Sequence, residues 1–214
     1  RAYDSTDYSS WLESNSITIE NSAPVMVTST ITSSDAPNAY ETSTLSASGT
    51  ATDADGDSLT YSYEWFVGAV STGQTGTTLT GPCFSKGNSA TCKIRAYDST
   101  DYSSWLESNS ITRENSAPEL DPIGSGSEEV RWGDLLTFIA QATDVDGDTL
   151  IFSLADGASG DVPEGAAITS GGDFTWTPTE AQGPGSYTFD VVVSDGSLTD
   201  SETITVTVGK RATT

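Results

Sequence analysis

The sequence has no histidine, and among its 214 residues it has only eight lysines and arginines, two cysteines and one methionine. Without histidine it cannot form a Ser-His-Asp triad, a Cys-His pair or the common zinc-binding spacings. It also lacks a glycine-rich phosphate-binding loop. These absences exclude the most familiar catalytic constellations, and we expect the protein not to be an enzyme.

The scarcity of basic residues leaves a strong acidic excess. Thirty-one Asp and Glu residues give a formal net charge of −23. Such a chain is repelled by nucleic-acid phosphates and by anionic membrane surfaces, so we expect no nucleic-acid partner. The sequence also has no apolar run of about 18 residues, the minimum for a membrane helix, which argues against membrane insertion in this segment. Cations are the natural partners of this charge.

Thr, Ser, Gly and Asp dominate, and apolar residues alternate with them, as in residues 59–67. High charge with low hydrophobicity also occurs in disordered chains, but regular aromatic and β-branched residues at a period of two favour strands. This composition predicts an extracellular, all-β protein with many turns. In that setting Cys83 and Cys92 are expected to form one local disulfide.

An internal repeat sets the domain organisation. The segment RAYDSTDYSSWLESNSIT opens the chain and returns at residue 95, and the match extends to Pro24 and Pro118 with one difference, Ile19 against Arg113. A spacing of roughly a hundred residues fits one small all-β domain. We therefore expect the last two strands of a preceding repeat at 1–24, complete domains at 25–118 and 119–209, and a tail at 210–214. An alternative is that residues 1–24 complement another copy of the chain in a fibre.

Two stretches of the second domain carry a family resemblance: ATDVDGDTLIFSL and PEGAAITSGGDFTWTPTEAQGPGSYTFDVVVSDGSLTDSETITVTV. They resemble the cadherin-like and "putative Ig" repeats of large bacterial and archaeal surface proteins. The first domain, with ATDADGDSLTYSYEWF, is similar to the polycystic-kidney-disease type of Ig-like repeat. The resemblance implies tandem immunoglobulin-like β-sandwiches at the cell surface, with Trp65 buried in the third strand and Tyr187 forming a tyrosine corner.

One motif occurs in both domains, directly after the second expected strand: Asp53-Ala-Asp55-Gly-Asp57 and Asp144-Val-Asp146-Gly-Asp148. Clustered carboxylates repel one another, and a hard cation with six to eight oxygen ligands relieves that repulsion, so calcium is the expected ion. The loop is not an EF-hand, which needs glycine at its sixth position, whereas here glycine is fourth. The alternative is that these aspartates only cap turns.

In an Ig-like sandwich the incoming linker, the loop after strand two and the loop after strand six lie at one end. This topology brings linker acids and amides toward each aspartate motif. The expected metal-binding residues are Glu20, Asn21, Asp53, Asp55, Asp57 and Asp98 at the first junction, with Asp101 nearby, and Glu114, Asn115, Asp144, Asp146, Asp148 and Asp195 at the second.

These expectations describe a structural, extracellular repeat protein, a calcium-stiffened rod of a stalk, adhesin or filament. Its partners would be neighbouring repeats or copies of itself, with a possible glycan or cell-surface target. The alternative function is a carbohydrate-binding or other ligand-binding accessory module of a secreted protein, using aromatics such as Tyr102 and Trp105. We expect Trp105 to pack instead in the core or on the neighbouring domain.

Overall fold

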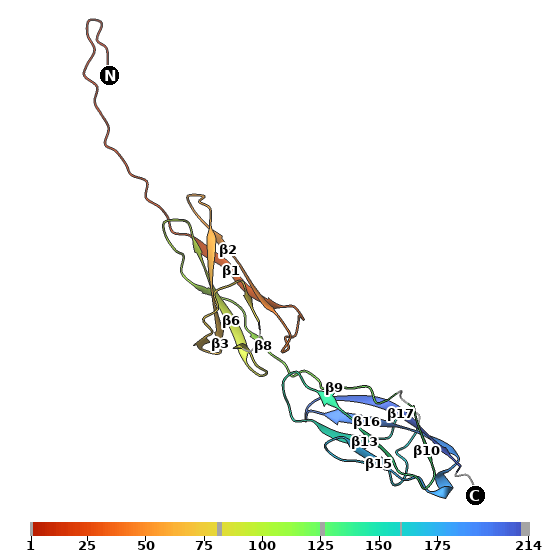
Figure 1. Ribbon diagram of the computed structural model, residues 1–214. Coiled ribbons are helices and arrows are strands. Elements are labelled where there is room, and N and C mark those ends of the chain that lie inside the picture. Colours follow the sequence, from red (N-terminus) through yellow and green to blue (C-terminus); the bar gives the residue numbers. More distant parts are fainter. Residues whose placement is uncertain (1, 81–82, 125–126, 159, 211–214) are drawn as a thin grey trace.

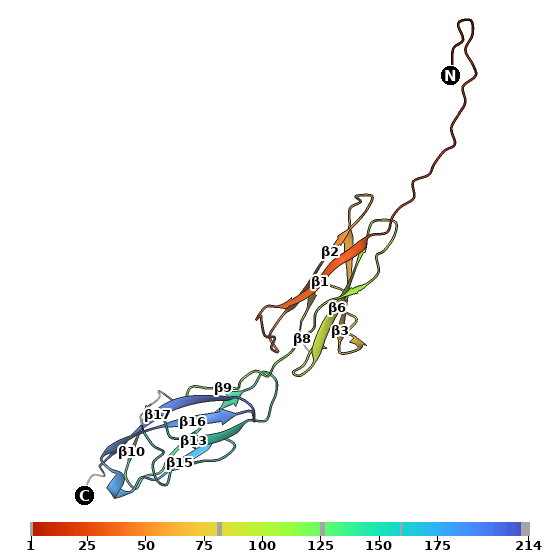
Figure 2. The same cartoon turned by 180° about the vertical axis from the view of Figure 1, so that it is seen from behind.

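A computed structural model describes residues 2–80, 83–124, 127–158 and 160–210. Two β-sandwiches follow one another along the chain, and residues 2–24 extend outward from the first (Figure 1). The view from behind shows the same end-to-end order (Figure 2). The all-β, tandem Ig-like fold expected from the sequence is confirmed.

The first sandwich has two antiparallel sheets. One sheet has the order β1-β2-β5, and in the other β4, β3 and β6 lie side by side while β7 and β8 both pair with β6. The strands are β1 (Val25–Ser33), β2 (Leu45–Thr52), β3 (Thr60–Val67), β4 (Val70–Ser71), β5 (Thr78–Leu79), β6 (Ser89–Tyr97), β7 (Leu106–Glu107) and β8 (Ile111–Thr112).

The core of the first sandwich follows from alternation along its strands. In β6 every second side chain is fully buried, and in β3 Trp65 is buried as the sequence predicts. The Trp65 indole N–H donates to the carbonyl of Gly76 at 2.9 Å, so its polar atom is satisfied inside the core.

The second sandwich repeats this plan. Its main sheet has the order β10-β17-β16-β13, in which β10 runs parallel to β17; it faces the sheet β11-β15-β14, and β9 pairs with β12. The elements are β9 (Glu119–Leu120), β10 (Ser127–Arg131), β11 (Leu136–Ile139), β12 (Ala142–Thr143), β13 (Ile151–Ala155), β14 (Ala167–Ile168), β15 (Asp173–Trp176), the 3-10 helix η2 (Glu180–Gln182), β16 (Gly185–Ser194) and β17 (Thr199–Gly209).

The apolar residues of β16 and β17 meet in the core of the second sandwich. Phe189, Val191, Val193 and Ile204 are fully buried. The Tyr187 hydroxyl donates to the carbonyl of Gln182 at 2.9 Å, which confirms the expected tyrosine corner. Most of the expected tail, 211–214, lies outside the described residues.

The two strands expected in residues 1–24 are not formed in the described part of this segment. Residues 2–23 are exposed, and their only recorded strand pairing is an isolated bridge between Tyr3 and Tyr8. In the nearly identical segment 95–118, β7 and β8 pair with β6. A strand needs a neighbouring strand to satisfy its backbone, and residues 2–24 have no sheet beside them.

The expected disulfide is also absent, because both cysteines are free thiols. Cys92 lies within β6 opposite Trp65 and is completely buried, whereas Cys83 is exposed. The alternation of β6 turns Cys92 into the core, away from the exposed surface on which Cys83 lies. Burial raises the pKa of the Cys92 thiol to about 11.

Candidate metal centre

The two aspartate motifs form the same loop in both sandwiches. Asp53 Oδ1 accepts hydrogen bonds from the backbone N–H groups of Asp55, at 2.9 Å, and Asp57, at 3.2 Å. Gly56 has a φ of +81°, in the left-handed region where glycine is favoured. The first aspartate therefore folds the loop with one carboxylate oxygen and keeps the other available.

The second loop matches the first in detail. Asp144 Oδ1 accepts from the N–H groups of Asp146, at 2.9 Å, and Asp148, at 3.2 Å, and Gly147 has a φ of +78°. The two sandwiches differ in sequence through much of their length, so this agreement reflects the shared Asp-x-Asp-Gly-Asp pattern.

In each loop the three carboxylates converge. One oxygen from each of Asp53, Asp55 and Asp57 lies within 4.8 Å of the other two, and the same holds for Asp144, Asp146 and Asp148. Within the described chain, the buried oxygens Asp53 Oδ2, Asp144 Oδ2 and Asp146 Oδ1 have no hydrogen-bond partner. Orphaned buried carboxylate oxygens are costly, and the donor set fits a hard, oxygen-seeking cation such as calcium.

The linker joins the loops at the first junction, as the topology predicts. Asn21 Nδ2 donates to Asp98 Oδ2 at 3.1 Å and to Asp101 Oδ2 at 3.0 Å. The backbone N–H of Ser22 donates to Asp55 Oδ2 at 2.7 Å. The linker thus contacts both the loop after β2 and the loop after β6.

The second junction has the same connections. Asn115 Nδ2 donates to Asp195 Oδ2 at 2.7 Å, and the N–H of Ser116 donates to Asp146 Oδ2 at 2.6 Å. The amide nitrogen of each linker asparagine therefore donates to the loop that follows β6 in the first sandwich or β16 in the second.

Asp98 and Asp195 have a different role from the clustered aspartates. Asp98 Oδ1 caps its own turn by accepting from the N–H groups of Thr100 and Asp101, both at 2.7 Å. The hydrogen bond from the Asp101 N–H lowers the pKa of Asp98, and the bond from the Asn21 amide acts in the same direction. Asp98 is thus held ionised, with both carboxylate oxygens engaged.

Asp195 shows the same arrangement, because its Oδ1 accepts from the N–H groups of Ser197 and Leu198, both at 2.6 Å. The Leu198 N–H is the largest cause that lowers the pKa of Asp195, followed by the Asn115 amide. Neither Asp98 nor Asp195 belongs to the three-carboxylate groups, and the exposed linker acids Glu20 and Glu114 do not belong to them either.

A basic residue that the sequence did not mark lies at the second junction. Lys86 belongs to the first sandwich, and its Nζ donates to Asn115 Oδ1 at 2.7 Å and forms an ion pair with Asp148 Oδ2. The hydrogen bond to Asp148 raises the pKa of Lys86. No local sequence pattern reveals this contact, because its partners are brought together only by the order of the two sandwiches.

The aromatic cluster considered for carbohydrate binding lies on the surface of the first sandwich. The Arg95 guanidinium lies 3.9 Å from the centre of the Tyr102 ring and 4.5 Å from that of Trp105. Trp105 is 39% exposed, so the expectation that it packs in the core is wrong. The Trp105 ring packs against Arg95, and part of the ring remains exposed to solvent.

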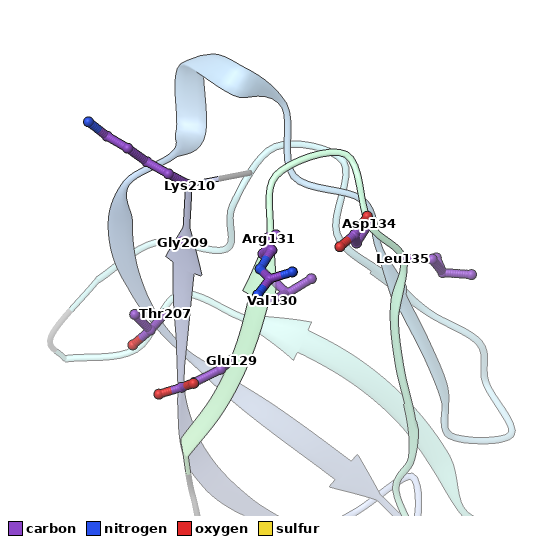
Figure 3. Close-up of a pocket in the computed structure, with 8 residues that line it drawn as sticks. All are labelled: Glu129, Val130, Arg131, Asp134, Leu135, Thr207, Gly209 and Lys210. Carbon is purple, nitrogen blue, oxygen red and sulfur yellow. The ribbon is translucent and has the colours of Figure 1, made fainter. Parts of the chain in front are cut away.

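A shallow hollow lies at the far end of the second sandwich, where β10 and β17 end. Figure 3 shows that the charged side chains around it do not converge: Lys210 points away from Arg131 and Asp134. The hollow therefore presents no concentrated set of reactive groups. The acidic loops at the junctions are the stronger candidate site.

Comparison with known proteins identifies part of the chain. Residues 125–209 match the family model described as "Putative Ig domain". The second sandwich is therefore an Ig-like domain, as its sequence resemblance implied. No curated protein matches the sequence.

Several solved structures resemble the chain at low identity. A three-domain fragment of Drosophila N-cadherin, EC1-3, is 15% identical with a TM-score of 0.39, over 89% of this chain and 69% of that chain. Human protocadherin-24 EC1-2 is 16% identical with a TM-score of 0.39, over 90% and 100%. An endo-fucoidan hydrolase of glycoside hydrolase family 107 is 18% identical with a TM-score of 0.36, over 76% of this chain and 25% of that chain.

Proposed function

We propose that this protein is a structural, non-enzymatic segment of an extracellular rod, in which calcium stiffens the junctions before the domains 25–118 and 119–209. The observation that supports it best is the paired geometry: at both junctions three carboxylates converge beside a linker that bonds to two loops. The acidic excess and the Ig-like domain are consistent with this function.

At each junction the clustered aspartates would hold the ion, and the linker would add oxygen ligands. Asp53, Asp55 and Asp57 are the ligands proposed for the first site, and Asp144, Asp146 and Asp148 for the second. Calcium would neutralise carboxylates that otherwise repel one another, and would join the linker to the loop after the second strand. The junction then bends less, which suits a stalk, an adhesin or a filament made of repeats.

None of the helical residues that the structure describes forms a segment with the length and hydropathy of a membrane span. An extracellular location is proposed from the Ig-like domain and the acidic composition. The partners proposed are neighbouring repeats, and through them a cell-surface target.

Thermal unfolding in a chelator and then in millimolar calcium tests this function. A ligand specific for the folded state stabilises by about 2.7 kcal/mol at a hundred times its dissociation constant, which raises the melting temperature by several degrees. The Asp53→Asn, Asp144→Asn double variant should lose this shift, because asparagine still accepts the turn hydrogen bonds but brings less charge.

The matched control is a Glu13→Gln, Asp121→Asn double variant, which removes the same charge at exposed positions outside both clusters. It should keep the calcium response. An unchanged melting curve in the unsubstituted protein would reject calcium binding and leave the aspartates as turn-forming residues.

The second candidate function is glycan binding on the first sandwich. The exposed face of Trp105, beside Arg95 and Tyr102, is the specific observation in its favour. Binding on a glycan array that disappears in Trp105→Ala would support it, and an array without signal would reject it.

A further inference from the structure

The second junction contains a positive charge that belongs to the protein itself. Lys86 Nζ lies between Asn115 Oδ1 and Asp148 Oδ2, so it contacts both the linker and the acidic loop. Asp146 and Asp144 also act on this ammonium group through their charges. Lys86 is carried by the loop before β6 of the first sandwich, whereas the aspartates belong to the second.

We propose that Lys86 acts as a tethered cation at the second junction, which holds the two sandwiches together when calcium is absent and competes with calcium for Asp148. The competition with calcium rests on the proposed function. The bridge between the two sandwiches does not, because it needs no metal.

The competition follows from the ligand atoms. Asp148 Oδ2 accepts from the Lys86 ammonium, so calcium can use this oxygen only after the ammonium leaves. Asn115 Oδ1, the linker oxygen that a cation would need, also accepts from Lys86. The tethered ammonium therefore occupies two oxygens of the donor set, while Asp144 Oδ2 and Asp146 Oδ1 have no partner among the described residues.

The first junction lacks this device in the part of the chain that the structure describes. Residues 2–24 contain neither lysine nor arginine, and no ion pair to Asp53, Asp55 or Asp57 is recorded. The two acidic loops thus have nearly the same geometry but different cation environments. Among the described residues, only the second acidic loop has an ion pair with a lysine of the protein itself.

The competition is tested by calorimetric calcium titration of the full chain in the Asp53→Asn background, where the second site alone reports. The Lys86 side chain is 37% exposed and that of Asp148 is 25% exposed, so the pair is a partly solvated one. Removing such a competitor should raise the calcium affinity of Lys86→Gln by about 2- to 5-fold. The gain should shrink as salt is added, because screening weakens the pair.

The bridge itself is tested without metal, by small-angle X-ray scattering in a chelator. Lys86→Gln should show a broader distribution of distances between the sandwiches than the unsubstituted chain. Lys93→Gln is the matched control, since it removes the same charge from a partly exposed position within β6, where the ammonium lies over the Phe66 ring. It should leave both the scattering and the calcium affinity unchanged.

The outcomes separate the two proposals. If the chain with Lys86→Gln and the chain with Lys86 bind calcium with equal affinity, the proposed competition is overturned and the proposed function stays intact. If no variant binds calcium, the proposed function fails, and the scattering in chelator still decides on the bridge. Identical scattering of Lys86→Gln and its parent would overturn the bridge.

Discussion

The one difference between the two copies of the repeated segment gives the sharpest test of the fold. Arg113 occupies the position of Ile19, and it is 1% exposed. Its Nη1 forms an ion pair with Glu41, and its guanidinium lies 4.7 Å from the centre of the Phe84 ring. Arg113→Ile would make the folded copy identical to the exposed one at this position.

The expected loss of stability comes from the contacts that Glu41 and Phe84 lose when the Arg113 guanidinium is removed. A hydrogen bond to a charged group contributes about 1.5–3 kcal/mol, and a cation–π contact about 0.5–2 kcal/mol. The Glu41 side chain is 27% exposed, so water replaces part of the lost ion pair, and the buried isoleucine returns some apolar contact. We expect a net loss of about 2 kcal/mol from the first sandwich, or about 8–16 °C in its melting temperature.

Differential scanning calorimetry of the full chain in chelator measures this loss, with the transition of the second sandwich as the internal reference. Ile19→Arg is the matched control, because it makes the reverse exchange at a position that is 89% exposed and should change stability by less than about 0.5 kcal/mol. A double-mutant cycle with Glu41→Gln isolates the pair. If Arg113→Ile costs the same in the Glu41→Gln background, the ion pair is not the source of the stability and the reasoning fails.

Three further outcomes follow from the same structure. Alkylation of the native protein should label Cys83 and not Cys92, and unfolding in denaturant should expose a second free thiol; a mass that indicates a disulfide would contradict the fold of β6. Because burial raises the pKa of Cys92 to about 11 from 9.0, the folded state binds its proton more tightly, so this contribution to stability is complete below pH 9 and is lost as the pH rises toward 11. In the Cys92→Ala variant, the free energy of unfolding measured in urea should lack this fall with rising pH. Gly172→Ala should lower the second transition by about 1–3 kcal/mol, since Gly172 has a φ of +97° and the added Cβ would lie 2.3 Å from the carbonyl oxygen of Ala140; an unchanged transition would refute this strain.

The repeated segment shows how far local sequence reaches. Asp4 Oδ1 accepts from the N–H groups of Thr6 and Asp7, and Asp98 Oδ1 accepts in the same way from the matching residues of the folded copy. Ser5 and Ser99 have φ values of 92° and 87°. This turn forms in both copies because all its hydrogen bonds lie within a few residues.

Pairing of the following residues depends on tertiary structure. Ile111 pairs with Ala90 of β6, whereas Ile17, in the identical sequence, is exposed and belongs to no strand. The amide side chain of Asn109 donates to the carbonyl of Ile31 at 3.1 Å and its oxygen accepts from the Ile31 N–H at 2.9 Å, so the folded copy is also held by β1. The sequence predicted strands in both segments, and only the one with neighbours has them.

The candidate site divides in the same way. The sequence by itself determined the two acidic loops, because Asp-x-Asp-Gly-Asp folds on its first carboxylate and places three aspartates together. It also determined the sandwich cores, because alternation decides which side chains face inward. These properties are local or periodic, and they can be read from the order of residues.

Only the tertiary structure decided which groups meet between elements. It placed Cys92 inside the core and Cys83 on the surface, and it brought Lys86 to Asp148 across 62 positions of sequence. Such contacts depend on how one sandwich follows another and on which face of a strand is covered. The sequence pattern carries no signal for them, because the energy of each contact exists only after the chain has folded.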